Sequence, residues 1–243
     1  MPALSTKKVA ILQSNYIPWK GYFDIINAVD EFIFYDEVQY TKNDWRNRNK
    51  IKTAQGLAWL TIPVRQEHLQ QRIDETKVFD QNWAVKHWRT LAQTYARATC
   101  FHLYKDQFEA VYAALKTVYL SQINFEFIQL ICTLLGITTK LSWSGDYAIP
   151  PGLGRTERLV WLVAAAGGNQ YLSGPAARTY LDAAQFEEAG IQLNWMEYDH
   201  YPVYKQLYGP PFQHGVSIVD LLFNEGENAP AFLKTFTNLP GHA

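Results

Sequence analysis

The chain has 243 residues, of which 48% are hydrophobic and 19% are charged, and its formal net charge is -1. This length permits one large domain or two small ones with a substantial core, and the apolar fraction excludes wholesale disorder. The balance of 22 basic against 23 acidic residues disfavours a general nucleic-acid binder.

The cysteines and the apolar runs indicate the compartment. Cys100 and Cys132 lie far apart in no ligand-like spacing, which disfavours a disulfide framework and a zinc site. No run reaches the roughly 18 apolar residues of a membrane span. The opening MPALSTKKVAIL holds too short an apolar stretch for a secretory signal. We therefore expect a cytoplasmic protein with no membrane span and no metal site.

The first part of the chain predicts a strand–helix–strand unit. Residues 9–13 and 31–36 are apolar runs typical of buried strands, and a helical pattern begins at Gly21 between them. Such a unit favours a parallel sheet. The middle of the chain is largely helical by pattern: after a strand over 58–64, we predict helices over 82–99, 106–120 and 123–135, then a strand over 138–143.

The run PPGLG at 150–154 marks the expected boundary between an N-terminal α/β half, residues 1–149, and a smaller C-terminal half, residues 150–243, that completes the sheet and the site. Strands are predicted over 170–173 and 191–198, and helices over 158–166, after Gly174-Pro175, up to Gly190, and over 217–223. The last twenty residues are expected to be peripheral. The fold class is α/β, a parallel sheet with helices on both faces.

The turn after the first strand, QSNYIPWKGYF, is the first candidate site. Ligands of open parallel sheets bind beyond the carboxyl ends of the strands, where the next helix offers free N–H groups. Gln13, Tyr16, Gly21 and Tyr22 are therefore binding candidates, and Lys20 is a candidate for phosphate contact and catalysis. The alternative is a packing turn with a solvated lysine.

The basic segment 42–52 is the second candidate, with five cations and one anion. If the segment is extended, Arg46 and Arg48 lie on one face and Asn47 and Asn49 on the other. Guanidinium groups suit phosphates, and amides suit sugar hydroxyls and base edges. Asn47, Arg48 and Asn49 are therefore predicted to bind ligand. The alternative is a solvated charged hairpin.

The stretch YLSGPAARTYL is the third candidate. A strand ends in Ser173-Gly174, a helix is predicted to begin, and Arg178 follows one turn later, so this stretch is predicted to bind an anion. The alternative is an ordinary capped helix.

A looser set adds Arg158 as a binding candidate and His200 and Asp220 as catalytic candidates. Alone, each is more typical of a structural or surface residue. A histidine base at His200 or His214 would need a positioned proton and a suitable pKa. The set also holds Arg155, Tyr204, Gln206 and Ser217.

Several common catalytic motifs are missing from the sequence. It contains no G-x-x-x-x-G-K-[ST], no G-x-G-x-x-G, no H-E-x-x-H and no G-x-S-x-G. P-loop, dinucleotide, zincin and serine-hydrolase chemistry are therefore disfavoured.

At the level of motifs, the chain resembles the WbqC-like protein family from about residue 9 to residue 226. The similar stretches are KVAILQSNYIPWKGYFDIINAVDEFIFYDEVQY, DWRNRNKIK, AWLTIPV, TERL, QYLSGPAARTYLD and GVSIVDLLFNEG. This resemblance implies a place in O-antigen or surface-polysaccharide biosynthesis, which is a pathway rather than a reaction.

A second resemblance is to the HIGH superfamily of nucleotidylyltransferases, which includes pantothenate synthetase. Trp19-Lys20-Gly21-Tyr22 stands where that superfamily has H-x-G-H, and the stretch from Ser173 through Arg178 to Tyr180-Leu181 is similar to the later signature of pantothenate synthetase. The resemblance implies a Rossmann-like sheet of the nucleotidylyltransferase type. Both imidazoles are absent here, and tyrosine donates only a neutral hydrogen bond. The chain is thus expected to bind a nucleotide without activating its α-phosphate in that way.

Together these features predict a transferase that binds a nucleotide or nucleotide-linked sugar and moves an acyl or aminoacyl group onto the sugar. No cofactor is required in this interpretation, and ATP or another nucleotide is the cofactor candidate. Two alternatives stay open: a non-catalytic nucleotide-sugar-binding module, and a metal-independent glycosyltransferase. The oligomeric state is not predicted.

Overall fold

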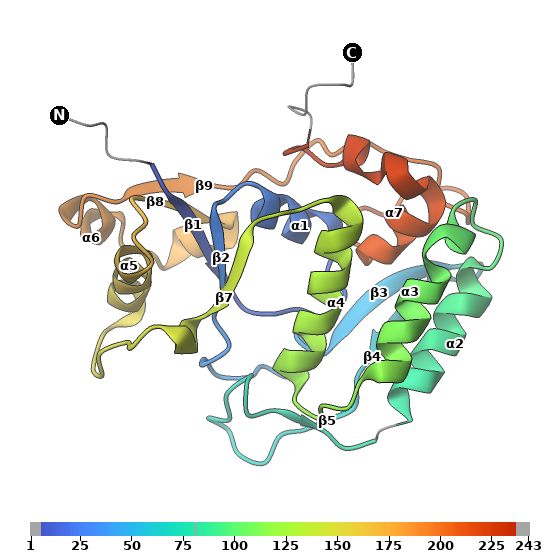
Figure 1. The fold of residues 1–243 in the computed structure, drawn as a ribbon, viewed down its shortest axis with the longest axis horizontal. Helices are drawn as coiled ribbons and strands as arrows, with labels where there is room; N and C mark the ends of the chain where they lie inside the picture. The colour runs from blue at the N-terminus through green and yellow to red at the C-terminus, as the bar shows by residue number, and fades with distance from the viewer. Residues whose placement is uncertain (1–5, 81, 237–243) are drawn as a thin grey trace.

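A five-stranded, fully parallel sheet forms the centre of the protein in a computed structural model that describes residues 6–80 and 82–236 (Figure 1). Its strand order is β7-β2-β1-β8-β9. The strands are β1 (Lys8–Leu12), β2 (Glu31–Phe34), β7 (Lys140–Trp143), β8 (Gln170–Ser173) and β9 (Gln192–Trp195). The chain builds one side of the sheet from β1 through β7 and then returns to β8, so the order reverses between β1 and β8. This is a doubly wound, Rossmann-like topology, and the predicted fold class is confirmed.

The apolar runs form strands because both faces of the sheet are covered. Helices α5 (Arg155–Ala165) and α6 (Ala183–Glu188) lie on one face, and α1 (Lys20–Asn27) and α4 (Leu120–Leu135) on the other (Figure 1). Alternate residues of β1 accordingly enter different clusters. Val9 and Ile11 pack in the cluster that contains α5, whereas Ala10 packs in the cluster that contains α1 and α4.

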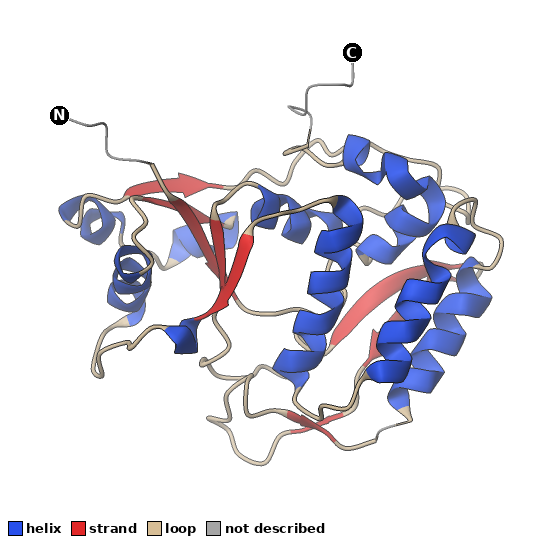
Figure 2. Cartoon of the chain, viewed as in Figure 1, coloured by secondary structure: helices blue, strands red, loops and turns tan. Residues whose placement is uncertain are grey.

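A mainly helical layer lies beyond α4 (Figure 2). It contains α2 (Trp83–Tyr95), α3 (Phe101–Ala114), α7 (Ile218–Glu225), the 3-10 segment η3 (Gly226–Phe232) and the antiparallel hairpin of β3 (Arg48–Thr53) and β4 (Gly56–Thr61). Two short strands, β5 (Val64–Arg65) and β6 (Lys77–Val78), pair nearby. The ring of Phe223 contacts Tyr95, Phe101 and Phe108, which fixes α7 against α2 and α3.

Several element predictions need correction. The basic segment, for which no element was predicted, contains the strand β3, in agreement with the extended conformation considered for it. Gly174-Pro175 opens a five-residue 3-10 helix, η2 (Pro175–Thr179), rather than an α-helix, and a second 3-10 turn, η1 (Ser144–Asp146), follows β7. The end of the described chain is not peripheral, because Leu233 and Phe236 are buried in the core. Residues 237–243 lie outside the described residues.

β8 and β9 come from the chain after residue 150 and join the same sheet as β1. The division of the chain at residues 149 and 150 stays a prediction. Across residues 6–80 and 82–236, no helix has both the length and the apolar character needed to cross a bilayer. Cys100 and Cys132 are both free thiols.

Candidate functional site

The carboxyl ends of β1 and β8 meet at the point where the strand order reverses. The two strands are paired, with Ala10 beside Leu172, so Gln13 and Ser173-Gly174 leave the sheet at the same edge. Open α/β sheets bind ligands in the crevice at this position. Two of the stretches predicted from the sequence therefore come together here.

The side chain of Arg46, from the loop before β3, lies beside the residues that follow β1. Its guanidinium donates hydrogen bonds to Oδ1 of Asn15 and, at 3.2 Å, to Oε1 of Gln13. Asp44 is 3.6 Å from the guanidinium and partly balances its charge. The hydroxyl of Tyr22 donates to the carbonyl oxygen of Gln13 at 2.9 Å. Gln13 and Tyr22, both predicted site residues, are thus held around one turn.

The turn after β1 is strained and is held in place from outside. Ile17 has a φ of 34°, a conformation that is costly for a β-branched residue. The side-chain amide of Asn49 donates to the carbonyl oxygens of Tyr16 and Ile17, at 3.1 and 2.9 Å. Asp36, at the end of β2, accepts from the backbone N–H of Ser14 at 2.8 Å. Strain of this kind persists where the surroundings over-determine the backbone, and such positions cluster at functional sites.

A cavity of about 330 Å³ opens beside this turn. Its walls come from three segments, residues 15–19, 45–49 and 214–215. Backbone hydrogen bonds join these segments nearby: the carbonyl of Lys50 accepts from the N–H of Ser217 at 2.8 Å, and the carbonyl of Pro18 accepts from the N–H of Ile218 at 2.9 Å. The cavity is lined by Asn15, Pro18, Trp19, Trp45, Asn49, His214 and Gly215. Indole walls combined with a few amide and imidazole groups are typical of small-molecule sites.

Trp19 connects this cavity to the end of β8. Its indole packs against Gly21, where an added Cβ would lie 2.3 Å from the ring, so only glycine permits this placement. Tyr198 packs edge-on against the same indole, with ring centroids 5.1 Å apart. The hydroxyl oxygen of Tyr198 lies 3.8 Å from the position that a Cβ on Gly174 would occupy. Through Tyr198, the Trp19 wall of the cavity thus lies close to the end of β8.

His214 is the titratable group of the cavity wall. Its imidazole is exposed and packs against Phe212, with centroids 4.5 Å apart. Partial desolvation by its neighbours and the nearby Lys20 ammonium lower the pKa of His214 below its ordinary value of 6.5. The imidazole is therefore neutral at pH 7 and can accept a proton.

Two predicted cations lie further along the sheet edge, each against an aromatic ring. The guanidinium of Arg178 lies 4.9 Å from the ring centroid of Trp195, at the end of β9. That of Arg158 lies 5.8 Å from the ring centroid of Tyr35, just past β2, and 4.0 Å from a carboxylate oxygen of Glu37. The ligand-binding role of Ser173, Gly174, Arg158 and Arg178 stays a prediction.

The polar groups of Lys20 and Tyr16 are engaged in contacts within the protein, and their roles in ligand binding stay predictions. The Lys20 ammonium is buried, donates to the carbonyl of Pro202 at 2.8 Å, and lies 4.9 Å from the ring centroid of Tyr201. Burial lowers the pKa of Lys20 to about 8, although the Asp24 carboxylate opposes this. The Tyr16 hydroxyl is fully buried and pairs with Nδ1 of His87 and with the hydroxyl of Tyr112.

His200 and Asp220 do not line the cavity. His200 is exposed and has a φ of 57°. Asp220 is buried in α7 and accepts hydrogen bonds from Tyr95 at 2.9 Å, Tyr204 at 2.7 Å and Gln206 at 2.9 Å. Its carboxylate holds the segment before α7 in place, and the catalytic role of His200 and Asp220 stays a prediction.

The amide and guanidinium faces of the basic segment do alternate. Asn47 and Asn49 are buried, and Asn47 donates to the carbonyl of Ile62 at 2.9 Å, so this amide binds backbone. Arg48 faces the other way, with its guanidinium 4.2 Å from the ring centroid of Trp59. The described contacts of Lys20, Arg48 and Arg178 share no residue, so these three cations do not meet at one point. The cation that contacts Gln13 and Asn15 at the end of β1 is Arg46.

Sequence reasoning missed Asn15 and Trp45 and left Arg46 and His214 outside the site. Trp45 and Arg46 could have been found from the sequence, because they stand in the basic segment directly before the predicted binding residues. For His214 the signal was weak, because its approach to Trp19 depends on contacts between distant segments.

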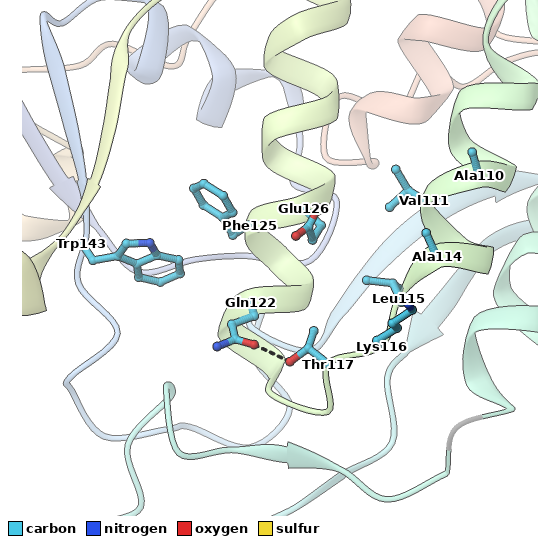
Figure 3. Close-up of a pocket in the computed structure, with 10 residues that line it drawn as sticks. All are labelled: Ala110, Val111, Ala114, Leu115, Lys116, Thr117, Gln122, Phe125, Glu126 and Trp143. Carbon is cyan, nitrogen blue, oxygen red and sulfur yellow. Dashed lines mark hydrogen bonds between the residues drawn. The ribbon is translucent and has the colours of Figure 1, made fainter.

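A larger cavity, of about 610 Å³, lies on another part of the molecule (Figure 3). It is formed by the end of α3, the start of α4 and Trp143 of β7, and most of its lining is apolar. Thr117 donates a hydrogen bond to Oε1 of Gln122 on its wall. It lacks the convergent amide and imidazole groups of the smaller cavity, so we do not assign it as the site.

A doubly wound parallel sheet with an indole- and amide-lined cavity beside its switch point defines a Rossmann-like α/β protein with a candidate small-molecule site. The profile of the WbqC-like protein family matches residues 13–232, and the chain belongs to this family. It is similar to the uncharacterized protein Rv1507c of Mycobacterium tuberculosis (strain ATCC 25618 / H37Rv), at 49% identity over 229 residues, which are 94% of this chain and 98% of that protein. No solved structure matches the chain.

Proposed function

We propose that this protein is a cytoplasmic transferase of surface-polysaccharide biosynthesis that binds a nucleotide-linked sugar and transfers an acyl or aminoacyl group to the sugar. The observation that carries the proposal is that the cavity lies next to the carboxyl ends of β1 and β8: Asn15 of its wall is bound by Arg46, and Trp19 of its wall packs against Tyr198 near Gly174. Membership of the WbqC-like family and the two free thiols support the pathway and the compartment.

The proposed ligand occupies both parts of this region. Its sugar ring lies between Trp19 and Trp45, where the apolar ring face meets indole and the hydroxyls meet the amide of Asn15. Its phosphates lie near the Arg46 guanidinium. Its nucleoside follows the sheet edge past Ser173-Gly174 toward Arg178.

The chemistry follows from the neutral imidazole. His214 removes a proton from the sugar hydroxyl or amine as that oxygen or nitrogen attacks the carbonyl carbon of a thioester. A C–O or C–N bond forms, the carbonyl π electrons move to oxygen, and the tetrahedral intermediate then collapses with cleavage of the C–S bond. The leaving thiolate takes the proton from the His214 imidazolium. Positioning and charge stabilisation supply the remaining rate enhancement.

Binding is tested with a thermal-shift panel of UDP-, GDP-, CDP- and ADP-linked sugars, because a ligand that binds the native state raises its Tm. We expect at least one class of nucleotide sugar to raise Tm and its free sugar to have little effect. A flat panel would refute the proposal.

Turnover is tested by mass spectrometry with the bound nucleotide sugar and acetyl-coenzyme A. A nucleotide sugar heavier by one acetyl group, with its diphosphate intact, is the expected product. Release of free nucleoside diphosphate would instead identify a metal-independent glycosyltransferase, and tight binding without any product would identify a non-catalytic module.

The role of His214 is tested by H214Q, which should lose turnover and keep binding. H102Q, a change of an exposed histidine on α3, is the control. H200Q decides between the two histidines: loss of turnover in H200Q with normal turnover in H214Q would return the role of base to His200.

A further inference from the structure

Two exposed tryptophans lie beside the cavity, Trp59 on β4 and Trp45 in the loop before β3. Trp45 is 41% exposed and Trp59 is 43% exposed, unusually high values for indoles. Their ring centroids lie 5.5 Å apart with 37° between the planes. We call this pair the tryptophan platform. Trp45 also lines the cavity, so a ligand leaving the cavity on this side passes directly onto the platform.

The Trp59 side of the platform belongs to one face of the hairpin. In the antiparallel register Lys50 lies opposite Trp59 and Arg48 lies opposite Thr61, so these side chains share a face. The other face carries Asn49 and is packed inward. Lys52, at one end of the same face, is buried against residues 206–211, whereas the part of the face around Trp59 is exposed.

Two cations stand over the platform. The guanidinium of Arg48 is 4.2 Å and the ammonium of Lys50 is 4.9 Å from the Trp59 ring centroid. The hydrogen bonds of the Arg48 guanidinium go to Asn43, through its side-chain and backbone oxygens, and its Nε has no partner among the described residues. Within the described part of the chain, neither cation forms an ion pair with a carboxylate. The surface thus presents aromatic faces and uncompensated positive charge together.

We infer that the tryptophan platform is a subsite for an acidic saccharide, one sugar unit beyond the ring held in the cavity. The inference rests on the proposed function, because the platform extends the same site. The C–H face of a pyranose ring stacks on indole, and a sugar carboxylate accepts charge-assisted hydrogen bonds from guanidinium and ammonium groups. A neutral glycan would leave both cations without an anionic partner, which favours an acidic chain.

The test uses trigalacturonate, maltotriose and ADP as probes, with affinities measured by isothermal titration on the full chain. The informative variant is W59A, and L57A is its matched control, because Leu57 lies on the same strand and is 45% exposed. Trp45 is left intact because it also lines the cavity.

We expect the wild type to bind trigalacturonate more tightly than maltotriose, and W59A to weaken trigalacturonate binding about tenfold. L57A should stay within about twofold of the wild type, and raising the salt from 50 to 500 mM should weaken trigalacturonate binding severalfold. R48Q should weaken trigalacturonate binding and leave maltotriose unchanged.

Absence of trigalacturonate binding, or equal binding by W59A and the wild type, would overturn the inference. Binding of ADP that is tighter and depends on Trp59 would also overturn it, since the platform would then be a nucleobase site. Nucleotide-sugar binding, measured on the same preparations, separates the two proposals. If it is lost only in W59A, the platform holds the nucleoside and the inference fails. If the wild type binds trigalacturonate through Trp59 but no nucleotide sugar, the platform stands and the proposed function fails.

Discussion

Removal of the Arg46 guanidinium is the most direct perturbation of the candidate site. The side chain is only 15% exposed and joins the side-chain oxygens of Gln13 and Asn15. Net contributions of hydrogen bonds from a charged donor are about 1.5–3 kcal/mol each, and partial solvation and the Asp44 pair reduce them here. We therefore expect R46M to lower the free energy of unfolding by about 1–3 kcal/mol.

The effect on ligand binding should be larger than the effect on folding. Loss of one charge-assisted contact with a phosphate weakens binding by about 10- to 100-fold. R46K keeps the charge but cannot span both acceptors with a planar fork, so it should fall between R46M and the wild type. R97M, a change at an exposed arginine after α2, is the matched control.

The assay combines urea unfolding, which gives the free energy of unfolding, with calorimetric titration of the nucleotide sugar identified by thermal shift. The two readouts separate a structural role from a binding role. If folded R46M bound the nucleotide sugar within about twofold of wild type, the placement of the phosphates at Arg46 would be refuted.

Three further predictions concern the surroundings of the site. G21A places a methyl group 2.3 Å from the Trp19 ring, so the indole must move; we expect about 1–3 kcal/mol lower stability in urea and weaker sugar binding, and unchanged binding would contradict the assignment of Trp19 as a cavity wall. Burial opposes ionisation of Glu31, but hydrogen bonds from Lys7, Tyr147, Ser142 and Lys140 lower its pKa from 4.5 to about 2, which corresponds to about 3 kcal/mol of stability at neutral pH. That stability is present above pH 4.5 and is lost as the pH falls toward 2, so E31Q should be less stable at pH 7 and should lack this acid-dependent slope in urea titrations from pH 7 to pH 2. D220N faces its amide toward donors from Tyr95, Tyr204 and Gln206 and should lose about 2–4 kcal/mol of stability with normal ligand affinity in the folded protein; a selective loss of turnover would instead support the catalytic role predicted from sequence.

The sheet was predictable because its strands are marked by local composition. A strand covered on both faces must be apolar at every position, so runs such as Val9–Leu12 and Phe32–Phe34 stand out without any knowledge of their neighbours. Parallel pairing and the return to β8 follow from the alternation of strands with helices. These rules depend on short stretches of chain, which is why they succeed here.

The positions of the cations were less predictable, because the alternation of side chains along a strand does not show which face of the strand is buried. Alternation correctly separated Asn49 from Arg48, but Asn49 turns inward to hold the strained turn at Ile17. Arg46 lies before β3 begins, so the strand period does not apply to it, and its side chain can reach Gln13. Tertiary contacts therefore decide between two arginines that look equivalent in the sequence.

The turn W-K-G-Y places its side chains in a way that explains how a ligand can bind without the paired imidazoles of H-x-G-H. The Trp19 indole packs against Gly21, the Lys20 ammonium is held by the carbonyl of Pro202, and the Tyr22 hydroxyl is held by the carbonyl of Gln13. All three side chains thus stabilise the turn, and of the three only Trp19 also lines the cavity. The positive charge at this position comes from Arg46, which belongs to another segment. Recognition at such a site depends on packing between segments distant in the sequence more than on the start of α1. Its affinity should therefore respond more strongly to changes at Arg46 or Trp45 than to changes at Lys20.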